Sequence, residues 1–231
     1  MSALIFDLET AGLPTEQFDK KTLELIAKKM EKRDDGANIE ESFGLSPLTG
    51  QVVAIGSVDG DSKRGAVYYL DPSGQADDHE TDGLVFRSFA SEKELIVKFW
   101  ELAERYDTFV TYNGRSFDVP FLNIRSAIHK IKPSKDLMEG RYLYQQRKTV
   151  HVDLYDQLTY YGGFRFATGG SLHMACQAFG ITTPKEDGID GSQVSAMFST
   201  GRYQEIAEYN ARDIQATKQL YADWRQFLAA S

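Results

Sequence analysis

The sequence ALIFDLET, from Ala3 to Thr10, decides the fold of this chain. Its apolar residues predict a buried strand over 2–8 that opens an α/β fold. Asp7 and Glu9 lie two residues apart, so both side chains leave a strand on the same face, about 6.6 Å apart at ~3.3 Å per residue. Carboxylates are the ligands that hard cations such as Mg²⁺ and Mn²⁺ prefer. The stretch therefore predicts metal ligands on a buried strand.

A second acidic motif, YNGRSFD, runs from Tyr112 to Asp118. It follows the short apolar stretch 108–112, which predicts a buried strand. The next residues, Val119 and Pro120, predict the start of a helix, because proline is well tolerated in a first helical turn. Asp118 is thus expected near a helix N-terminus, where backbone N–H groups favour an anion.

The third motif, YNARD, runs from Tyr209 to Asp213 within a predicted helix over 203–227. Tyr209 and Asp213 are four residues apart and share a helix face, about 6 Å apart along the axis at ~1.5 Å per residue. We therefore expect the acids of the three motifs to point into one cleft. Two divalent cations held there can hydrolyse a phosphodiester.

Each motif alone has a simpler explanation. Asp7 and Glu9 could lie on a solvated face, Asp118 could cap a helix, and Tyr209 with Asp213 could combine core packing with a surface acid. All three explanations would have to coincide in the right order and on the right elements. The combination therefore favours catalysis.

The rest of the chain alternates predicted strands and helices. With the two strands above, we predict an α/β fold with a central mixed five-stranded sheet flanked by helices, in a single domain over 1–231 with a helical insertion at about 15–43. The stretch 71–82 is expected to be an acidic loop. The further predicted strands are 51–59, 65–70 and 151–154, and the further predicted helices are 16–33, 92–106, 171–179 and 192–198.

Composition limits the function classes. The 231 residues include 34 Asp and Glu against 26 Lys and Arg, a net charge of -8, which argues against tight, non-specific binding to long duplexes. A short single-stranded end is the better candidate ligand. Cys176 is the only cysteine, and no apolar run has the length of a membrane span or a signal peptide. We therefore expect a cytoplasmic protein without membrane association.

The three motifs resemble those of the DEDD superfamily of 3′–5′ exonucleases, which have a ribonuclease-H-like fold. The second motif is similar to that of the proofreading domain of family-B DNA polymerases. The whole pattern looks most like stand-alone exonucleases related to that domain. One branch of the superfamily has a histidine five residues before the last Asp, where this chain has Glu208, and the other has a tyrosine four residues before it, where this chain has Tyr209. The chain therefore resembles the tyrosine-using, DEDDy branch.

The resemblance implies a role for each motif residue. Asp7, Glu9 and Asp213 would bind one Mg²⁺ or Mn²⁺ ion, and Asp7 with Asp118 a second. Tyr209 would orient the attacking water, since an ordinary tyrosine pKa of about 10 makes it a poor base near neutral pH. The products would be nucleoside 5′-monophosphates released from the 3′ end of a single strand, with DNA favoured.

Substrate contacts are also expected. The segment Arg141–Lys148 interleaves basic and aromatic residues as a platform for single strands does, although an amphipathic helix end explains it equally well. Lys185 could contact the scissile phosphate, or be a solvated loop lysine. The candidate substrate-binding residues are Thr10, Leu13, Asn113 and Lys185 from the resemblance, and Arg141, Tyr144 and Arg147 from the basic and aromatic segment.

Other functions stay open at this point. The chain could be a non-catalytic nucleic-acid-binding module on the same fold, although binding phosphate does not require four converging carboxylates. It could also be an exoribonuclease, because the choice between DNA and RNA rests on contacts to the 2′-OH. A metal-dependent hydrolase of small phosphate esters is a further possibility that fits the acidic composition.

Overall fold

A computed structural model describes residues 2–30, 42–167, 169–182 and 191–229. Within them, the strands form one mixed sheet in the order β4-β5-β3-β2-β1-β6-β7. The first strand, β1, lies inside the sheet, antiparallel to β2 and parallel to β6. The strands are β1 (Ala3–Gly12), β2 (Gly50–Asp59), β3 (Gly65–Leu70), β4 (His79–Thr81), β5 (Leu84–Phe89), β6 (Thr108–Thr111) and β7 (Val150–Asp153).

The prediction of five strands was wrong, because the sheet has seven. The two extra strands are β4 and β5, which lie at one edge, where β5 pairs in parallel with β3. β4 is only three residues long and lies at the end of the stretch expected to be an acidic loop. Its pairing with β5 stabilises it, and a three-residue strand has no periodic pattern that sequence can reveal.

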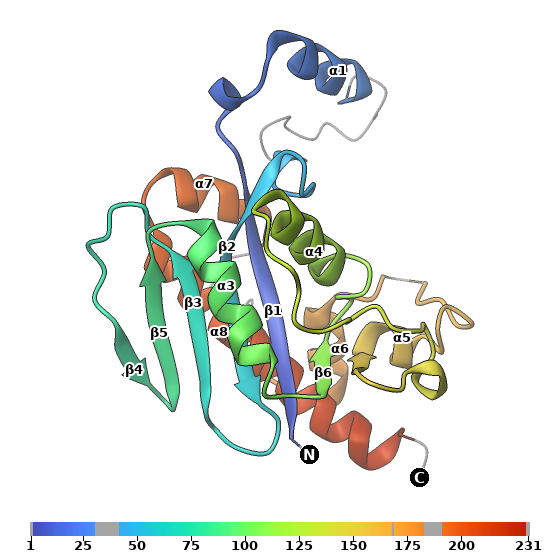
Figure 1. Cartoon of the computed structure of the whole chain (residues 1–231). Helices are drawn as coiled ribbons and strands as arrows, with labels where there is room; N and C mark the ends of the chain where they lie inside the picture. The colour runs from blue at the N-terminus through green and yellow to red at the C-terminus, as the bar shows by residue number, and fades with distance from the viewer. Residues whose placement is uncertain (1, 31–41, 168, 183–190, 230–231) are drawn as a thin grey trace.

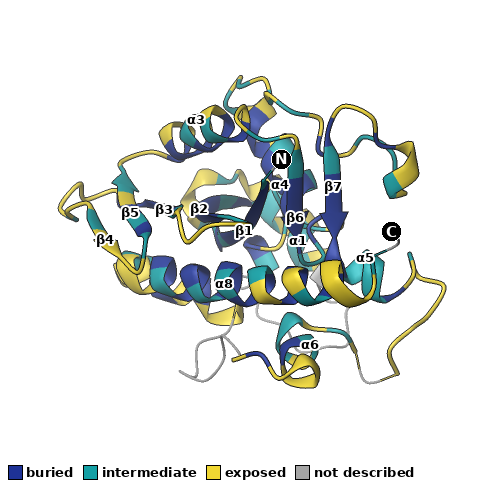
Figure 2. Ribbon diagram, turned by 90° about the horizontal axis from the view of Figure 1, so that it is seen from below, coloured by how far each residue is buried: buried dark blue, intermediate teal, exposed yellow. Residues whose placement is uncertain are grey.

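Helices cover both faces of the sheet (Figures 1 and 2). On one face, α3 packs on β2, β3 and β5, and α4 packs beside it. On the other face, α8 crosses β1, β2 and β3, with α6 and α7 packed on α8. The described helices of more than one turn are α1 (Lys20–Met30), α3 (Glu92–Ala103), α4 (Asp118–Ile128), α5 (Leu154–Leu158), α6 (Leu172–Phe179), α7 (Val194–Ser199) and α8 (Tyr203–Phe227); the short 3₁₀ turns are Thr15–Gln17, Leu143–Gln145 and Gly191–Gln193.

The core forms around β1, which has helices above and below it. Phe6 is fully buried, and its ring centroid lies 5.2 Å from that of Phe99 in α3 and 6.4 Å from that of Phe109 in β6. Burial on both faces explains why the start of β1 is a continuous apolar run rather than an alternating one. The acidic motif therefore sits on a strand that the core holds rigidly.

A buried ion pair joins α3 and α4 to the start of β2. The Arg125 guanidinium donates to both carboxylate oxygens of Glu92, at 2.9 and 2.5 Å. The backbone N–H of Val52 also donates to Glu92 Oε1, at 2.8 Å, and His129 Nε2 lies 2.6 Å from Oε2. These contacts fix the helix that carries Asp118 relative to the sheet.

The expected helical insertion is present in part. The 3₁₀ turn and α1 follow β1, and in Figure 1 α1 stands beyond the end of β1, away from the sheet. The helix begins at Lys20 rather than at residue 16, and the Asp19 side chain before it accepts a hydrogen bond from the Thr22 N–H at 2.7 Å. Residues 31–41 of the insertion lie outside the described residues.

Candidate active site

Asp7 and Glu9 lie on the part of β1 that pairs with β2. Asp7 is opposite Gly56, and the register shifts between Glu9 and Thr10, which is a β-bulge directly after the second acid. Bulges occur beside active sites because they change the direction in which the following side chains point. β1 thus presents both carboxylates on one face before the strand bends.

The motif of α8 reaches this face because of Gly56. A Cβ atom at Gly56 would lie 2.3 Å from Asn210 Oδ1, so only glycine permits this approach of helix and strand. The Asn210 side-chain amide then donates from Nδ2 to Asp7 Oδ2 at 2.8 Å. Asn210 is fully buried, and sequence reasoning did not select it as a site residue. Its place in the YNARD motif is the one feature of the sequence that could have indicated a role for Asn210 in the site.

Three carboxylates meet at this point. One oxygen from each of Asp7, Glu9 and Asp213 lies within 4.8 Å of the others. Oxygen ligands at such separations suit a hard divalent cation, and Mg²⁺ is commonly bound by a few carboxylates together with water. The donor set therefore fits the metal that the motifs imply.

Asp118, the fourth acid, is hydrogen-bonded to the backbone of β1. The backbone N–H of Leu8, between the two acids of β1, donates to Asp118 Oδ1 at 2.9 Å. Asp118 is the first residue of α4 and is buried. It does not belong to the group of three, but this bond fixes it beside the same stretch of β1.

The acids are costly to ionise without a cation. Burial raises the pKa of Asp7 and of Glu9 well above the usual range, and the neighbouring carboxylates raise both further. Burial also raises the pKa of Asp118 to about 7, against hydrogen bonds that lower it. A bound divalent cation reverses this balance because its charge stabilises the carboxylate forms.

Tyr209 feels the negative charge of the same three carboxylates. Burial raises the pKa of its hydroxyl, and the negative charges of Asp213, Glu9 and Asp7 raise it further. The hydroxyl therefore keeps its proton at neutral pH. In this state Tyr209 can donate a hydrogen bond and position a water molecule, but it cannot act as a base.

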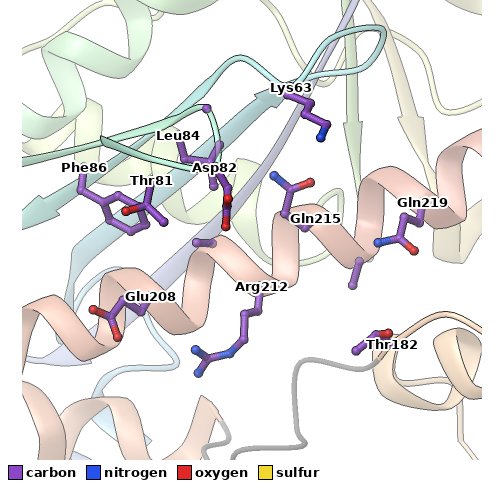
Figure 3. A pocket seen from close by; sticks show the side chains of 13 residues that line it. Lys63, Thr81, Asp82, Leu84, Phe86, Thr182, Glu208, Arg212, Gln215 and Gln219 are labelled. Atoms are coloured by element: carbon purple, nitrogen blue, oxygen red, sulfur yellow. The ribbon is translucent and has the colours of Figure 1, made fainter. Parts of the chain in front are cut away.

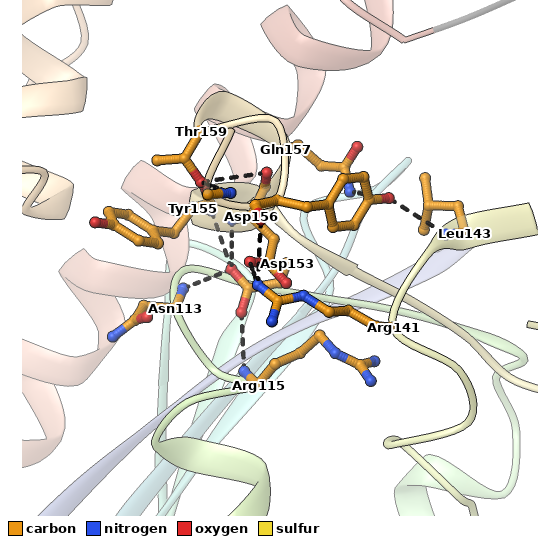
Figure 4. A network of polar contacts seen from close by, with 11 residues as sticks. Asn113, Arg115, Arg141, Leu143, Asp153, Tyr155, Asp156, Gln157 and Thr159 are labelled. Atoms are coloured by element: carbon orange, nitrogen blue, oxygen red, sulfur yellow. Dashed lines mark hydrogen bonds and ion pairs between the residues drawn. The ribbon is translucent and has the colours of Figure 1, made fainter. Parts of the chain in front are cut away.

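Asp153 holds the second motif in place (Figure 4). Its carboxylate accepts hydrogen bonds from the N–H groups of Asn113, at 2.8 Å, and Arg115, at 2.9 Å. It also caps α5 by accepting from the Tyr155 N–H at 3.0 Å. Asn113 has a left-handed backbone, with φ of 63°, which these bonds stabilise. Asp153 is not among the site residues predicted from the sequence.

The candidate substrate residues occupy different places. The Thr10 hydroxyl donates to the carbonyl of Gly44 at 2.7 Å, and Leu13 lines a cavity of about 600 Å³ with Phe43, Phe198 and Tyr203. Asn113 follows β6 beside Asp153. Lys185 lies outside the described residues.

The basic and aromatic segment Arg141–Lys148 forms a short 3₁₀ turn at Leu143–Gln145 rather than a helix end. Arg141 donates to Asp156 at 3.0 Å. Tyr144 is 80% exposed and stacks on Tyr142 with ring centroids 5.5 Å apart, and Arg147 is exposed. These residues thus lie on the surface beside α5.

A larger cavity of about 700 Å³ lies between the β4–β5 hairpin and α8 (Figure 3). Gln215 of α8 points towards the hairpin that carries Asp82, whereas the Arg212 side chain extends away from the hairpin. The described lining of the cavity includes none of the four acids. The cavity is therefore separate from the acidic site.

Comparisons with known proteins identify the family of this chain. Residues 48–229 match the family described as predicted 3′–5′ exonucleases related to the exonuclease domain of PolB. The chain belongs to this exonuclease family. The family and its polymerase relatives support 3′–5′ exonuclease activity, and exonuclease domains of this type depend on metal ions.

Curated relatives of the exonuclease are DNA polymerases. DNA polymerase 1 of Sulfolobus acidocaldarius is 25% identical over 150 residues, covering 63% of this chain and 16% of the relative. The DNA polymerase of Methanocaldococcus jannaschii is 39% identical over 74 residues, covering 28% of this chain and 4% of the relative. The exonuclease thus spans a small part of the length of these relatives.

The fold has a solved counterpart. The family B DNA polymerase of Pyrobaculum calidifontis superposes with a TM-score of 0.64 at 19% identity, covering 98% of this chain and 25% of that chain. The ribonuclease-H-like α/β fold expected from the motifs is thereby confirmed. No described helix combines the length and apolarity needed to cross a membrane.

Proposed function

We propose that this exonuclease removes nucleoside 5′-monophosphates from the 3′ end of single-stranded DNA, using two Mg²⁺ or Mn²⁺ ions, and that residues 1–231 act as one exonuclease domain. The observation that carries the proposal is the approach of the Asp7, Glu9 and Asp213 oxygens to within 4.8 Å of one another. Hydrogen bonding places Asp118 beside the same stretch of β1. A site with four acids suits metal-dependent phosphodiester hydrolysis.

The four acids divide into two ligand sets. Asp7, Glu9 and Asp213 would hold one cation, and Asp7 with Asp118 would hold the other. When bound, the cations would supply an activated water and neutralise charge on the leaving 3′ oxygen. Asn210 keeps Asp7 in the orientation that serves both sets, through its bond to Oδ2. Tyr209 retains its proton and donates a hydrogen bond to the attacking water, which aligns that water with the phosphate.

The net charge of the chain and its similarity to DNA polymerases favour single-stranded DNA as the substrate. The net charge of -8 disfavours tight binding along a duplex backbone. The curated relatives are DNA polymerases, and the chain matches their sequence over 63% of its own length in one case. Thr10 and Leu13, directly after the acids of β1, are the nearest candidates for contact with the terminal nucleotide. RNA remains the alternative substrate.

A gel assay tests the proposal. The protein is incubated with Mn²⁺ and 5′-labelled single-stranded DNA, RNA or blunt duplex. We expect a ladder of products that shortens from the 3′ end, fastest on single-stranded DNA. Asp7→Ala should abolish the ladder because it removes a ligand of both cations. Full activity of this variant, or binding of the strand without any shortening, would overturn the proposal, and faster RNA shortening would reassign the substrate.

A further inference from the structure

A row of aromatic rings leads away from the second motif. The ring centroids of Tyr112 and Tyr155 are 5.9 Å apart, those of Tyr155 and Phe166 are 6.5 Å apart, and those of Phe166 and Phe164 are 5.6 Å apart. We call these four residues the aromatic row. Its members come from the end of β6, from α5 and from the loop between α5 and α6. Tertiary packing brings these residues together, and none of them belongs to the basic and aromatic segment at 141–148.

The outer end of the row is open to solvent. Phe164 is 57% exposed and Phe166 is 36% exposed, whereas Tyr112 and Tyr155 are half-buried. Single exposed apolar side chains are common on protein surfaces and need no explanation. Two adjacent exposed phenylalanines in a continuous series of rings are different, because their rings meet edge to face, at 82°, and together expose more apolar ring surface than one ring does.

The loop is built to hold the rings in place. A Cβ atom at Gly170 would lie 2.6 Å from the Tyr155 ring and 2.7 Å from the Phe166 ring, so the glycine backbone packs closely against both. The carbonyl of Gly170 accepts a hydrogen bond from the Tyr112 hydroxyl at 2.7 Å. Gly170 therefore ties the outer ring Phe166 to the inner ring Tyr112.

The inner end of the row adjoins the acidic site. Tyr112 directly precedes Asn113, and the N–H groups of Asn113 and Tyr155 both donate to Asp153 Oδ1, at 2.8 and 3.0 Å (Figure 4). The helix that follows this loop, α6, packs on α8, which carries the third motif. The row thus begins at the first residue of the second motif, Tyr112, and ends on the surface.

The charge on the row suits a polyanion. Arg165 lies between the two phenylalanines and is exposed. Among the described residues, no ion pair or side-chain hydrogen bond is recorded for it, so its guanidinium is available to a ligand. Alternating rings and cations are typical of surfaces that bind single strands, where bases stack on the rings and phosphates meet the cations.

We propose that the aromatic row stacks the bases of a single nucleic-acid strand on the 5′ side of the nucleotide being removed, with Arg165 contacting a phosphate. This inference rests on the proposed function, because it assumes that a 3′ end enters the acidic site. It deepens that function by naming the surface that carries the rest of the strand. A duplex cannot use the row, since its bases are stacked on one another.

Strand binding without cleavage tests the proposal. A 5′-fluorescein-labelled oligothymidylate of about twelve nucleotides is titrated with protein in Ca²⁺, with a gel to verify that the strand stays intact, and anisotropy gives Kd. Phe164→Ala should raise Kd about fivefold or more, the loss of one base stack. Phe227→Ala, which removes another exposed ring at the far end of α8, is the matched control and should leave Kd unchanged.

Two further measurements separate stacking from a structural effect. On a strand of equal length with abasic sites in place of its internal bases, the wild type and Phe164→Ala should bind equally. Arg165→Gln should reduce the slope of log Kd against log salt by about 0.7, the value for one phosphate contact on a single strand. Thermal unfolding of each variant verifies the fold.

The proposed stacking on the aromatic row would be overturned by an unchanged Kd of Phe164→Ala on the oligothymidylate. It would also be overturned if Phe164→Ala lost as much affinity for the abasic strand as for the oligothymidylate. This result can occur while the wild type still shortens DNA, so the proposed function would stand. Conversely, ring-dependent binding without any shortening in Mn²⁺ would support the row and overturn the exonuclease assignment to the acidic site.

Discussion

At the scale of single residues, the position of Asp7 depends on a neighbour that is not acidic. Asn210 donates to Asp7 Oδ2, while its own Oδ1 is buried and has no hydrogen-bond partner among the described residues. The amide is therefore held by Gly56 on one side and Asp7 on the other. Groups that orient metal ligands typically affect metal affinity and activity by about 10- to 100-fold when removed.

Asn210→Leu should lower Mn²⁺ affinity about 10- to 100-fold, because it removes the donor that orients Asp7 while preserving side-chain volume. Isothermal titration calorimetry with Mn²⁺ measures the change. Gln219→Leu, on an exposed position of the same helix, is the control and should bind Mn²⁺ as the wild type does. Equal affinities of Asn210→Leu and wild type would show that Asp7 needs no support from Asn210.

Tyr209→Phe should slow strand shortening about 10- to 100-fold, because the attacking water loses its positioning bond. Mn²⁺ affinity should stay within about twofold, since the hydroxyl is not assigned as a metal ligand. Single-turnover rates and calorimetry separate the two effects. Tyr221→Phe, on the same helix, should match the wild type in both. A Mn²⁺ affinity that fell in parallel with the rate would assign Tyr209 to metal binding instead.

At the scale of elements, the Glu92–Arg125 pair determines where α4 begins relative to β1. Both side chains are almost fully buried, with relative exposures of 5% and 7%. A buried pair contributes little net stability compared with apolar residues, but removing one partner leaves the other charge uncompensated. Because α4 starts with Asp118, the pair also fixes the fourth acid.

Glu92→Gln should lower the free energy of unfolding by about 3–5 kcal/mol, the usual cost of leaving one buried charge without its partner. Chemical denaturation measures this change. Glu101→Gln, on an exposed position of the same helix where the glutamate pairs with Lys98, is the control and should change stability by less than about 1 kcal/mol. A loss as small as that of the control would mean that water or a rearrangement compensates Arg125.

Sequence predicted the elements that carry long patterns and missed those that tertiary pairing creates. α8 was predicted with its observed bounds because 25 residues display a complete amphipathic repeat. Ser91 caps α3, and its hydroxyl accepts from the Glu94 N–H at 3.3 Å. β4 could not be predicted, since three residues gain their extended form only by pairing with β5.

At the scale of the whole molecule, the four acids come from positions spread over nearly the entire chain. Their convergence could be predicted from the sequence, whereas the residues that hold them in place could not. Asp7, Glu9 and Asp213 were expected in one cleft from their placement on a strand and a helix, and the structure brings their oxygens together. Gly56 and Asp153 were missed as supports, because a glycine in a strand and an acid after one look ordinary until their neighbours are known.

The acid stability of the molecule should depend on His151. Its Nδ1 lies 2.9 Å from the Leu137 carbonyl and its Nε2 lies 2.8 Å from the Thr111 hydroxyl, which the neutral ring satisfies. Burial lowers its pKa to about 4. In the unfolded chain this histidine has an ordinary pKa of about 6.5, so on acidification the unfolded state binds the proton before the folded state does. The contribution of the neutral His151 to the free energy of unfolding is therefore fully present above about pH 6.5 and is lost as the pH falls towards 4.

Unfolding free energies measured in EDTA at several pH values between 4 and 7 test this expectation. The loss attributable to His151 should reach about 3 kcal/mol at the acid end. His151→Gln should show a flatter dependence than the wild type, and the difference between the two removes the contribution of the carboxyl groups that both contain. Parallel curves would show that His151 is protonated in the folded state.

The pairing of β1 with α8 across the sheet has a consequence for biosynthesis. In a growing chain, Asp7 and Glu9 are made well before Asn210 and Asp213, which meet them only when α8 has left the ribosome and packed onto β1 and β2. Until then the group of acids lacks Asp213. A nascent chain without α8 should therefore be unable to cut nucleic acid.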